Sequence, residues 1–174
     1  MGGPKALVKL GDVTALEMAV LRLKEAGCST PTVVVGAQHQ DVMRCHQTLD
    51  VRWAINTDWE LGMFSSLQCG LRSIQPQPTR LLVQLVDHCR VTTAALVDIL
   101  ECSLKHPDRV IRPAHAGRHG HPVVLPDEVI RVILESNGHV TLREILSPFA
   151  FMMESFDMDD RYISNDFDTP YDLI

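Results

Sequence analysis

Apolar residues between positions 14 and 27 recur three and four residues apart, which is the spacing of one face of a helix. Thr14 and Glu17 fit a capping box at its start, and Gly27 ends the pattern. Similar signals predict six more helices. Three of them run from His39 to Gln47, from a Ser65 cap to Ile74, and from Thr92 to about Leu104. A fourth has Pro126 at its first position, a short fifth ends at Leu146, and Asp168 opens the last.

Short runs of β-branched and aliphatic residues lie between these helices. They predict strands at Thr32–Val35, Val51–Ile55, Arg80–Val86, Arg109–Arg112, Val123–Leu125 and Phe151–Phe156. Strands that alternate with helices form a mostly parallel sheet covered on both faces. We therefore expect a Rossmann-like α/β/α sandwich, in which ligands bind beyond the carboxyl ends of the strands, in the loops after Gly36, Asn56, Asp87 and Pro113.

The length of 174 residues, 45% of them hydrophobic, predicts one domain over residues 1–174. No run approaches the roughly 18 apolar residues of a membrane-spanning helix, and aromatic residues make up only 5% of the chain. The net charge of −6 lies entirely in residues 154–174, so the rest of the chain has no basic field for a nucleic acid. The composition favours neither a membrane nor a nucleic-acid partner.

The five cysteines are widely spaced and include no Cys-x-x-Cys pair. A disulfide framework or a thiolate zinc site is therefore disfavoured. The first eleven residues show neither an apolar signal region nor an amphipathic transit pattern. These features predict a protein of the reducing cytoplasm.

Asp87 directly follows a strand that is predicted to be buried on both faces. A buried carboxylate is costly to ionise unless a cation meets it, and Mg²⁺ prefers one or two carboxylates together with substrate phosphates. Asp87 is therefore either a metal ligand or a cap of the next turn. Asp166 is a second candidate carboxylate, whereas Asp168 suits the cap of the last helix.

Two glycine-containing segments could bind anions. Gly2 and Gly3 precede Lys5, whose ammonium group suits phosphate oxygens, although a solvated tail has the same composition. Ser65 and Ser66 follow Gly62 at a predicted helix start, where they could bind an anion or a base edge, or simply cap the helix.

The loop that contains His115, His119 and His121 offers a different chemistry. Clustered imidazoles without thiolates could bind a transition metal. Gly117, Gly120 and the residue after His121, a proline, suggest instead a tight loop that leads into the next strand.

Taken in order, the segments MGGPKAL, VVVGA, NTDWELGMFSSLQCGL, LLVQLVDH, GRHGHPVVL and DFDTPYDL resemble the MobA-like nucleotidyltransferases, and most closely the molybdenum cofactor cytidylyltransferases. The resemblance runs over nearly the whole chain. It implies transfer of a nucleoside monophosphate from an NTP, with CTP favoured, to a phosphorylated acceptor such as the molybdopterin cofactor, with release of pyrophosphate.

The resemblance also assigns roles to residues. It implies that Lys5 contacts the NTP phosphates beside Gly2 and Gly3, and that Asp87 binds Mg²⁺ or Mn²⁺ with Asp166 completing the metal site. Gly62, Ser65 and Ser66 would lie by the nucleotide, and His121 near the acceptor. The attack on the α-phosphorus would be in line, without a covalent enzyme intermediate.

Members of this family open with a strand and a glycine loop ahead of the Met-Gly, so we expect this chain to be incomplete at its N-terminus. That strand lies in the middle of the sheet, between the strands predicted at Thr32–Val35 and within Leu81–Val86. Without it, the two strands could close on each other, Ala6–Leu10 could replace it, or a second molecule could supply an edge; we favour the last, and with it a homo-oligomer. Two alternative functions are a catalytically impaired structural or regulatory partner and a metal-binding protein that uses the histidine loop.

Overall fold

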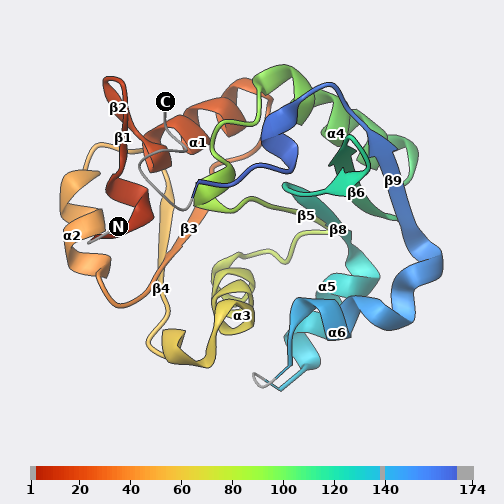
Figure 1. Ribbon diagram of the computed structural model, residues 1–174. Coiled ribbons are helices and arrows are strands. Elements are labelled where there is room, and N and C mark those ends of the chain that lie inside the picture. The colour runs from red at the N-terminus through yellow and green to blue at the C-terminus, as the bar shows by residue number, and fades with distance from the viewer. Residues whose placement is uncertain (1–2, 138–139, 168–174) are drawn as a thin grey trace.

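The computed structural model describes residues 3–137 and 140–167. Helices lie on both sides of a central layer of strands, as the alternation of elements predicts (Figure 1). The predicted Rossmann-like α/β/α sandwich is confirmed. The helix predicted after Asp168 lies outside the described residues.

The central layer consists of two separate groups of strands. β3 (Thr32–Val35) pairs in parallel with β4 (Arg52–Ile55). The larger group has the order β5-β8-β6-β7, with β9 beside β6; its strands are β5 (Arg80–Val83), β8 (Val123–Pro126), β6 (Val110–His115), β7 (Arg118–His119) and β9 (Met153–Asp157). β8 is antiparallel to both β5 and β6, whereas β9 is parallel to β6. β5, β6 and β9 therefore share one direction and β8 runs against them, so the central layer is mixed, with most of its strands parallel in direction.

The side chains of β8 show how the layers pack. Val124 belongs to the core cluster beneath α4 (Thr93–Lys105), whereas Val123 and Leu125 belong to the cluster beneath α5 (Asp127–Glu135). Successive residues of a strand point to opposite faces, so each face of β8 is covered by one helix. α1 (Ala15–Glu25) packs beside α4, and α3 (Met63–Ser73) packs beside α5.

The capping box of α1 forms as predicted. The Thr14 hydroxyl accepts a hydrogen bond from the Glu17 N–H, and the Glu17 carboxylate accepts one from the Thr14 N–H. Two predicted helix starts are wrong. Pro126 precedes α5 as its N-cap and is still part of β8, and α3 begins at Met63 rather than after Ser65.

The strand predicted at Arg80–Val86 ends at Val83, and Val86–His88 forms a 3-10 helix (η3) that carries Asp87. All four residues of β5 are only half-buried, so the prediction of a strand buried on both faces is wrong as well. The physical reason is that β5 pairs with β8 on one side and with no described strand on the other.

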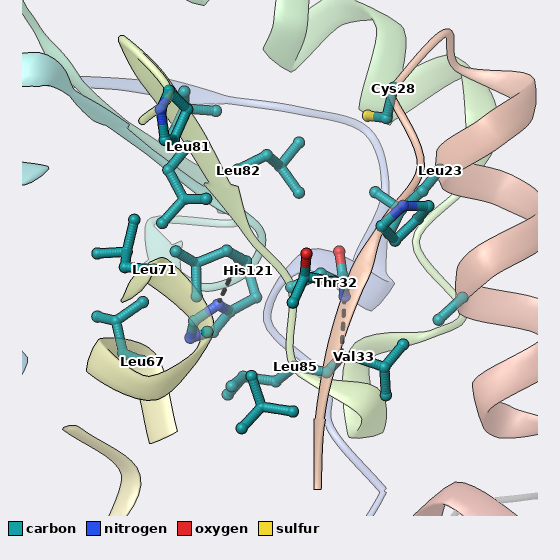
Figure 2. A pocket seen from close by; sticks show the side chains of 18 of the residues that line it. Leu23, Cys28, Thr32, Val33, Leu67, Leu71, Leu81, Leu82, Leu85 and His121 are labelled. Atoms are coloured by element: carbon teal, nitrogen blue, oxygen red, sulfur yellow. Dashed lines mark hydrogen bonds between the residues drawn. The ribbon is translucent and has the colours of Figure 1, made fainter. Parts of the chain in front are cut away.

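β3 and β5 are the two strands that we expected to lack a shared partner, and they do not pair with each other. A cavity of about 980 Å³ lies between them, with β3 and α1 on one side and β5 and α3 on another. Figure 2 shows Thr32 and Val33 on β3 and Leu81 and Leu82 on β5 on opposite sides of this space. We call it the inter-strand cavity.

Residues 6–10 do not enter this cavity as a substitute strand. η1 (Lys5–Leu7) is a short 3-10 helix, and β1 (Lys9–Leu10) forms a hairpin with β2 (Val13–Thr14), which the sequence analysis did not predict. Of the three ways to complete the sheet, direct closure of the two strands and replacement by Ala6–Leu10 are therefore both wrong for the described residues.

The remaining elements are short. They are α2 (His39–Cys45), α6 (Leu142–Leu146) and the 3-10 helices η2 (Trp59–Leu61), η4 (Ser147–Met152) and η5 (Arg161–Ile163). All five cysteines are free thiols. Over residues 3–137 and 140–167, every helix is too short or too polar to cross a lipid bilayer.

Candidate active site

Lys5 and Asp87 meet at the carboxyl end of β5. The Lys5 ammonium donates a hydrogen bond to Oδ2 of Asp87 over 2.8 Å, and the side chains are 32% and 19% exposed. Oδ1 of Asp87 is buried and has no hydrogen-bond partner among the described residues. A buried carboxylate oxygen without a donor is costly, so this oxygen is available to a cation.

The last described segment lies against this pair. The Lys5 ammonium is 5.9 Å from the ring centroid of Phe167, and Phe167 belongs to the same core cluster as Val86, the residue before Asp87. Asp166, which directly precedes Phe167, is exposed. The fold therefore brings the segment that carries Asp166 close to Asp87. Among the described residues, no hydrogen bond joins the Asp166 side chain to this site.

His121 lines the inter-strand cavity, and Figure 2 shows its ring beside β5. Its Nδ1 lies 3.4 Å from the Val83 carbonyl oxygen, and its ring centroid lies 5.2 Å from that of His88. Burial, and then the neighbouring His88, lower the pKa of His121 below its ordinary value of 6.5. The neutral imidazole that this favours has one N–H donor and one acceptor nitrogen.

Gly120 allows the chain to deliver His121 to this position. A Cβ atom on Gly120 would stand 1.7 Å from the carbonyl oxygen of Ile163, and the His121 N–H donates a 3.0 Å hydrogen bond to the same oxygen. Only glycine permits the backbone to approach so closely. The loop into β8 is therefore attached to the segment around Ile163.

Ser65 and Ser66 are held by a residue that the sequence analysis did not single out. The buried Asn56 amide donates hydrogen bonds to both hydroxyls, over 2.9 and 3.0 Å, while its Oδ1 accepts one from the Asp58 N–H. The Ser65 hydroxyl also lies within bonding distance of the Asp58 and Gly62 carbonyl oxygens. The Ser65 side chain thus links the loop of residues 56–62 to the first turn of α3. Ser65 lies within the helix and is not its N-cap.

Gly62 precedes α3 with a φ of 96°, a left-handed conformation that favours glycine. Gly62 and Ser66 line the same inter-strand cavity as His121. Gly3 is exposed, and Gly2 lies outside the described residues. The structure therefore places Gly62, Ser66 and His121 around one cavity. Asp87, with its partner Lys5, is outside that lining but directly precedes His88, whose ring lies 5.2 Å from that of His121.

The histidine loop does not form a cluster. The His115 Nδ1 lies 2.9 Å from the Met158 carbonyl oxygen, His119 is exposed on β7, and His121 faces β5. In the part of the chain that the structure describes, no three His, Cys, Asp or Glu side chains gather as a metal site. This arrangement does not support a transition-metal site at the loop.

A hard divalent cation fits the Lys5–Asp87 site better. Mg²⁺ and Mn²⁺ take oxygen ligands, and Mg²⁺ commonly uses one or two carboxylates plus substrate phosphates instead of an all-protein cage. Asp87 offers a buried oxygen without a hydrogen-bond donor. Asp166 directly precedes Phe167, which belongs to the same core cluster as Val86 beside Asp87. Such a site needs the substrate to complete it.

Two further residues emerge only from the structure. His88 is buried beside His121, and its Nδ1 lies 3.2 Å from the Tyr162 carbonyl oxygen. The Gln84 amide donates to the Leu85 and His88 carbonyl oxygens, while its Oε1 is buried without a partner among the described residues. His88 directly follows Asp87 and Gln84 lies three residues before it. This proximity in the sequence is the signal that could have identified them.

The sheet between two helix layers, with its polar residues at the carboxyl ends of the strands, defines an α/β protein built to bind a ligand at that edge. Residues 1–155 match the MobA-like NTP transferase domain, and the chain belongs to that family. This membership, which the motifs predict, indicates nucleotidyltransferase-type activity.

The chain is 28% identical over 177 residues to nicotine blue oxidoreductase of Paenarthrobacter nicotinovorans, an alignment that covers 96% of this chain and 84% of the relative. Among solved structures, Rv0371c from Mycobacterium tuberculosis H37Rv has a TM-score of 0.84 and 21% identity, over 99% of this chain and 87% of that one. A manganese complex of the same protein has a TM-score of 0.80 at 20% identity, over 98% and 90% of the two chains. These structures establish the fold.

Proposed function

We propose that this protein transfers a nucleoside monophosphate from an NTP, preferably CTP, to a phosphorylated small molecule such as molybdopterin and releases pyrophosphate. The observation that carries the proposal is the Lys5–Asp87 pair at the carboxyl end of β5, with one buried carboxylate oxygen left without a donor. A cation and a carboxylate side by side suit a substrate that carries both phosphates and a divalent metal.

In this proposal each residue of the site has its own role. The Lys5 ammonium holds phosphate oxygens of the NTP, and Asp87 with Asp166 holds Mg²⁺ or Mn²⁺, which when bound supplies positive charge beside the leaving pyrophosphate. Ser66 and Gly62 lie by the nucleotide, with Ser65 fixed behind them through Asn56. Gly3, two residues before Lys5, offers its backbone N–H to the phosphates, and the same role predicted for Gly2 lies outside the described residues.

The acceptor phosphate attacks the α-phosphorus in line, so no side chain needs to form a covalent intermediate. His121 lies on the acceptor side. Its lowered pKa keeps the imidazole neutral near pH 7; with Nδ1–H directed at the Val83 carbonyl, Nε2 is left to accept a hydrogen bond from the second substrate. The protein's contribution is therefore mainly orientation and electrostatic stabilisation of the transition state.

Pyrophosphate release from CTP, GTP and ATP, with a phosphorylated pterin as acceptor, tests this proposal. Asp87→Asn should remove Mn²⁺ binding and activity, whereas Asp127→Asn, at the exposed start of α5, should change neither. If the unmodified chain binds Mn²⁺ and an NTP but turns over none of the three, the catalytically impaired regulatory protein becomes the better description. Mn²⁺ binding that survives in Asp87→Asn would contradict the assignment of the metal ligand.

A second candidate function is oxidoreductase activity. It is favoured by one observation, the 28% identity over 96% of the chain to a relative named nicotine blue oxidoreductase. Oxidation of NADH or NADPH in the presence of nicotine blue or a quinone would support it. The two candidates separate cleanly, because the first consumes an NTP and the second consumes a reduced nicotinamide.

A further inference from the structure

Arg112 places a positive charge in the middle of the central layer. It lies on β6, which pairs with β8 and with β9. The residue is half-buried, and its Nε atom is buried without a hydrogen-bond partner among the described residues. The two terminal nitrogens reach solvent, and no carboxylate within residues 3–137 and 140–167 forms an ion pair with them. Arginine is almost never buried unless it is paired, so this position needs an explanation.

The register of the strands gives Arg112 three polar neighbours on its own face of the sheet. Arg112 is paired with Ser155 of β9. Two residues further along β6, Ala114 is paired with Asp157 of β9 and with His119 of β7. Paired residues project to the same face, as do residues two apart on one strand. Ser155, Asp157 and His119 are all exposed, so solvent reaches this face beside Arg112.

The same face is apolar where β6 and β9 begin. Val110 and Met153, which precede Arg112 and Ser155 by two residues, pack in the core cluster beneath α5. α5 and α6 lie at the end of the sheet where β9 begins (Figure 1). The helices therefore cover the first residues of the two strands on this face, and the Arg112 guanidinium group lies where that cover ends. An arginine can pack its stem against a core in this way while its terminal nitrogens stay in water.

The acids nearest to Arg112 in the sheet do not neutralise it. Asp157 shares its face, but Oδ1 of Asp157 accepts a 3.1 Å hydrogen bond from the Gly117 N–H. Glu154 is paired with Ile111 and projects from the opposite face. The part of the chain that the structure describes therefore leaves the charge of Arg112 without a counter-ion.

We propose that Arg112 and Ser155 form a binding site for a small oxyanion, a phosphate or a carboxylate, on the open part of this sheet face. The terminal nitrogens of a guanidinium group present N–H donors in a fixed fork that matches two oxygens of such an anion. The Ser155 hydroxyl adds a donor beside the fork. Packing, and not internal hydrogen bonds, holds the Arg112 side chain, so these donors are available to a ligand.

This inference does not rest on the proposed activity. In the strand order β5-β8-β6, two strand spacings, or about 10 Å, separate β6 from β5, which leads into Asp87. The site at Arg112 is therefore separate from the Lys5–Asp87 pair. Its test needs neither an NTP nor a metal.

The test is a titration of the isotope-labelled full chain with inorganic phosphate, followed by NMR at constant ionic strength set with sodium chloride. The Nε–H signal of Arg112 and the amide signal of Ser155 report binding at this position in the chain. We expect both signals to shift and to saturate. A parallel titration with sodium acetate distinguishes the two sources of the anion, because it shows whether a carboxylate binds in place of a phosphate.

Three variants locate the anion. Arg112→Gln should weaken phosphate binding, measured at the Ser155 amide, at least about tenfold, a difference of about 1.4 kcal/mol. Arg118→Gln is the matched control, because Arg118 is exposed on β7 and its pairing with His115 directs it to the opposite face. It should leave binding unchanged. Lys5→Met alters the cation of the candidate active site and should also leave the shift of Ser155 unchanged.

If Arg112→Gln fails to fold by circular dichroism, the Arg112 signal of the unmodified chain decides. Three results would each overturn the proposal. They are the absence of a saturable shift with both anions, unchanged affinity in a folded Arg112→Gln, and loss of the shift in Lys5→Met.

Discussion

The Lys5 ammonium lies 2.8 Å from Oδ2 of Asp87, a contact between residues 82 positions apart in the sequence. It connects the segment before the first long helix to the end of β5. One oxygen of Asp87 is thus already neutralised by a cation, while the other is buried without a partner among the described residues. The relationship makes Lys5 a competitor for cations at Asp87 as well as a ligand for phosphates.

Lys5→Met should therefore change the two affinities in opposite directions. Loss of the ammonium frees Oδ2 of Asp87 and removes a repulsive charge, so Mn²⁺ alone should bind more tightly. The same loss removes a charge-assisted contact to phosphate, so the NTP should bind about tenfold or more weakly. Calorimetric titration with Mn²⁺ and with CTP measures both, and a fall in both affinities would show that Lys5 does not compete for Asp87.

Ser65 and Ser66 should respond differently to alanine. Ser65→Ala breaks the bonds with Asn56 and the loop carbonyls inside the core, and we expect the free energy of unfolding to fall by about 1–3 kcal/mol. Ser66→Ala removes a hydroxyl on the cavity wall, so nucleotide affinity should fall with a smaller loss of stability. Urea unfolding and NTP binding compare the two; equal stability losses would contradict the separation.

Gly120→Ala should destabilise the protein and displace His121. The added methyl group would meet the Ile163 carbonyl oxygen at 1.7 Å, so the backbone on one side has to move. Overpacking of this kind typically costs about 1–3 kcal/mol. Gly3→Ala is the matched control, because a Cβ at Gly3 meets nothing within 4 Å. Urea unfolding of both variants gives the comparison, and similar midpoints would contradict the close contact.

His121 should make stability depend on pH. Because its pKa in the folded protein lies below 6.5, the unfolded chain binds a proton at a higher pH than the folded chain does. This contribution to the free energy of unfolding is fully present above about pH 6.5 and is lost as the pH falls through the folded pKa.

His121→Gln should flatten that dependence, whereas His119→Gln, at an exposed position, should leave it unchanged. Urea unfolding between about pH 7.5 and pH 5 measures the slope. A slope that is the same in the parent chain and in both variants would show that His121 is not the group responsible.

The alternation of apolar and polar residues by itself determined most of the secondary structure. The capping box of α1, the β-branched run of β3 and the apolar faces of α4 and α5 are local patterns, and they form because each buries its own apolar side against the sheet. The ordered motifs determined the family. They also make Asp87 a candidate, because a carboxylate after an aliphatic run is visible in the sequence; its role as a metal ligand stays a prediction.

The contacts that make a site were decided by the tertiary structure. Lys5 reaches Asp87, Asn56 holds Ser65 and Ser66, and His88 lies against His121 only after the strands are placed side by side. The helix start at Met63 depends on a left-handed Gly62 and on hydrogen bonds from Ser65 that no local pattern encodes. Strand length was decided in the same way. β5 stops at Val83 and stays half-buried because burial of a strand depends on neighbours on both of its edges, and on the β3 side of β5 lies the inter-strand cavity.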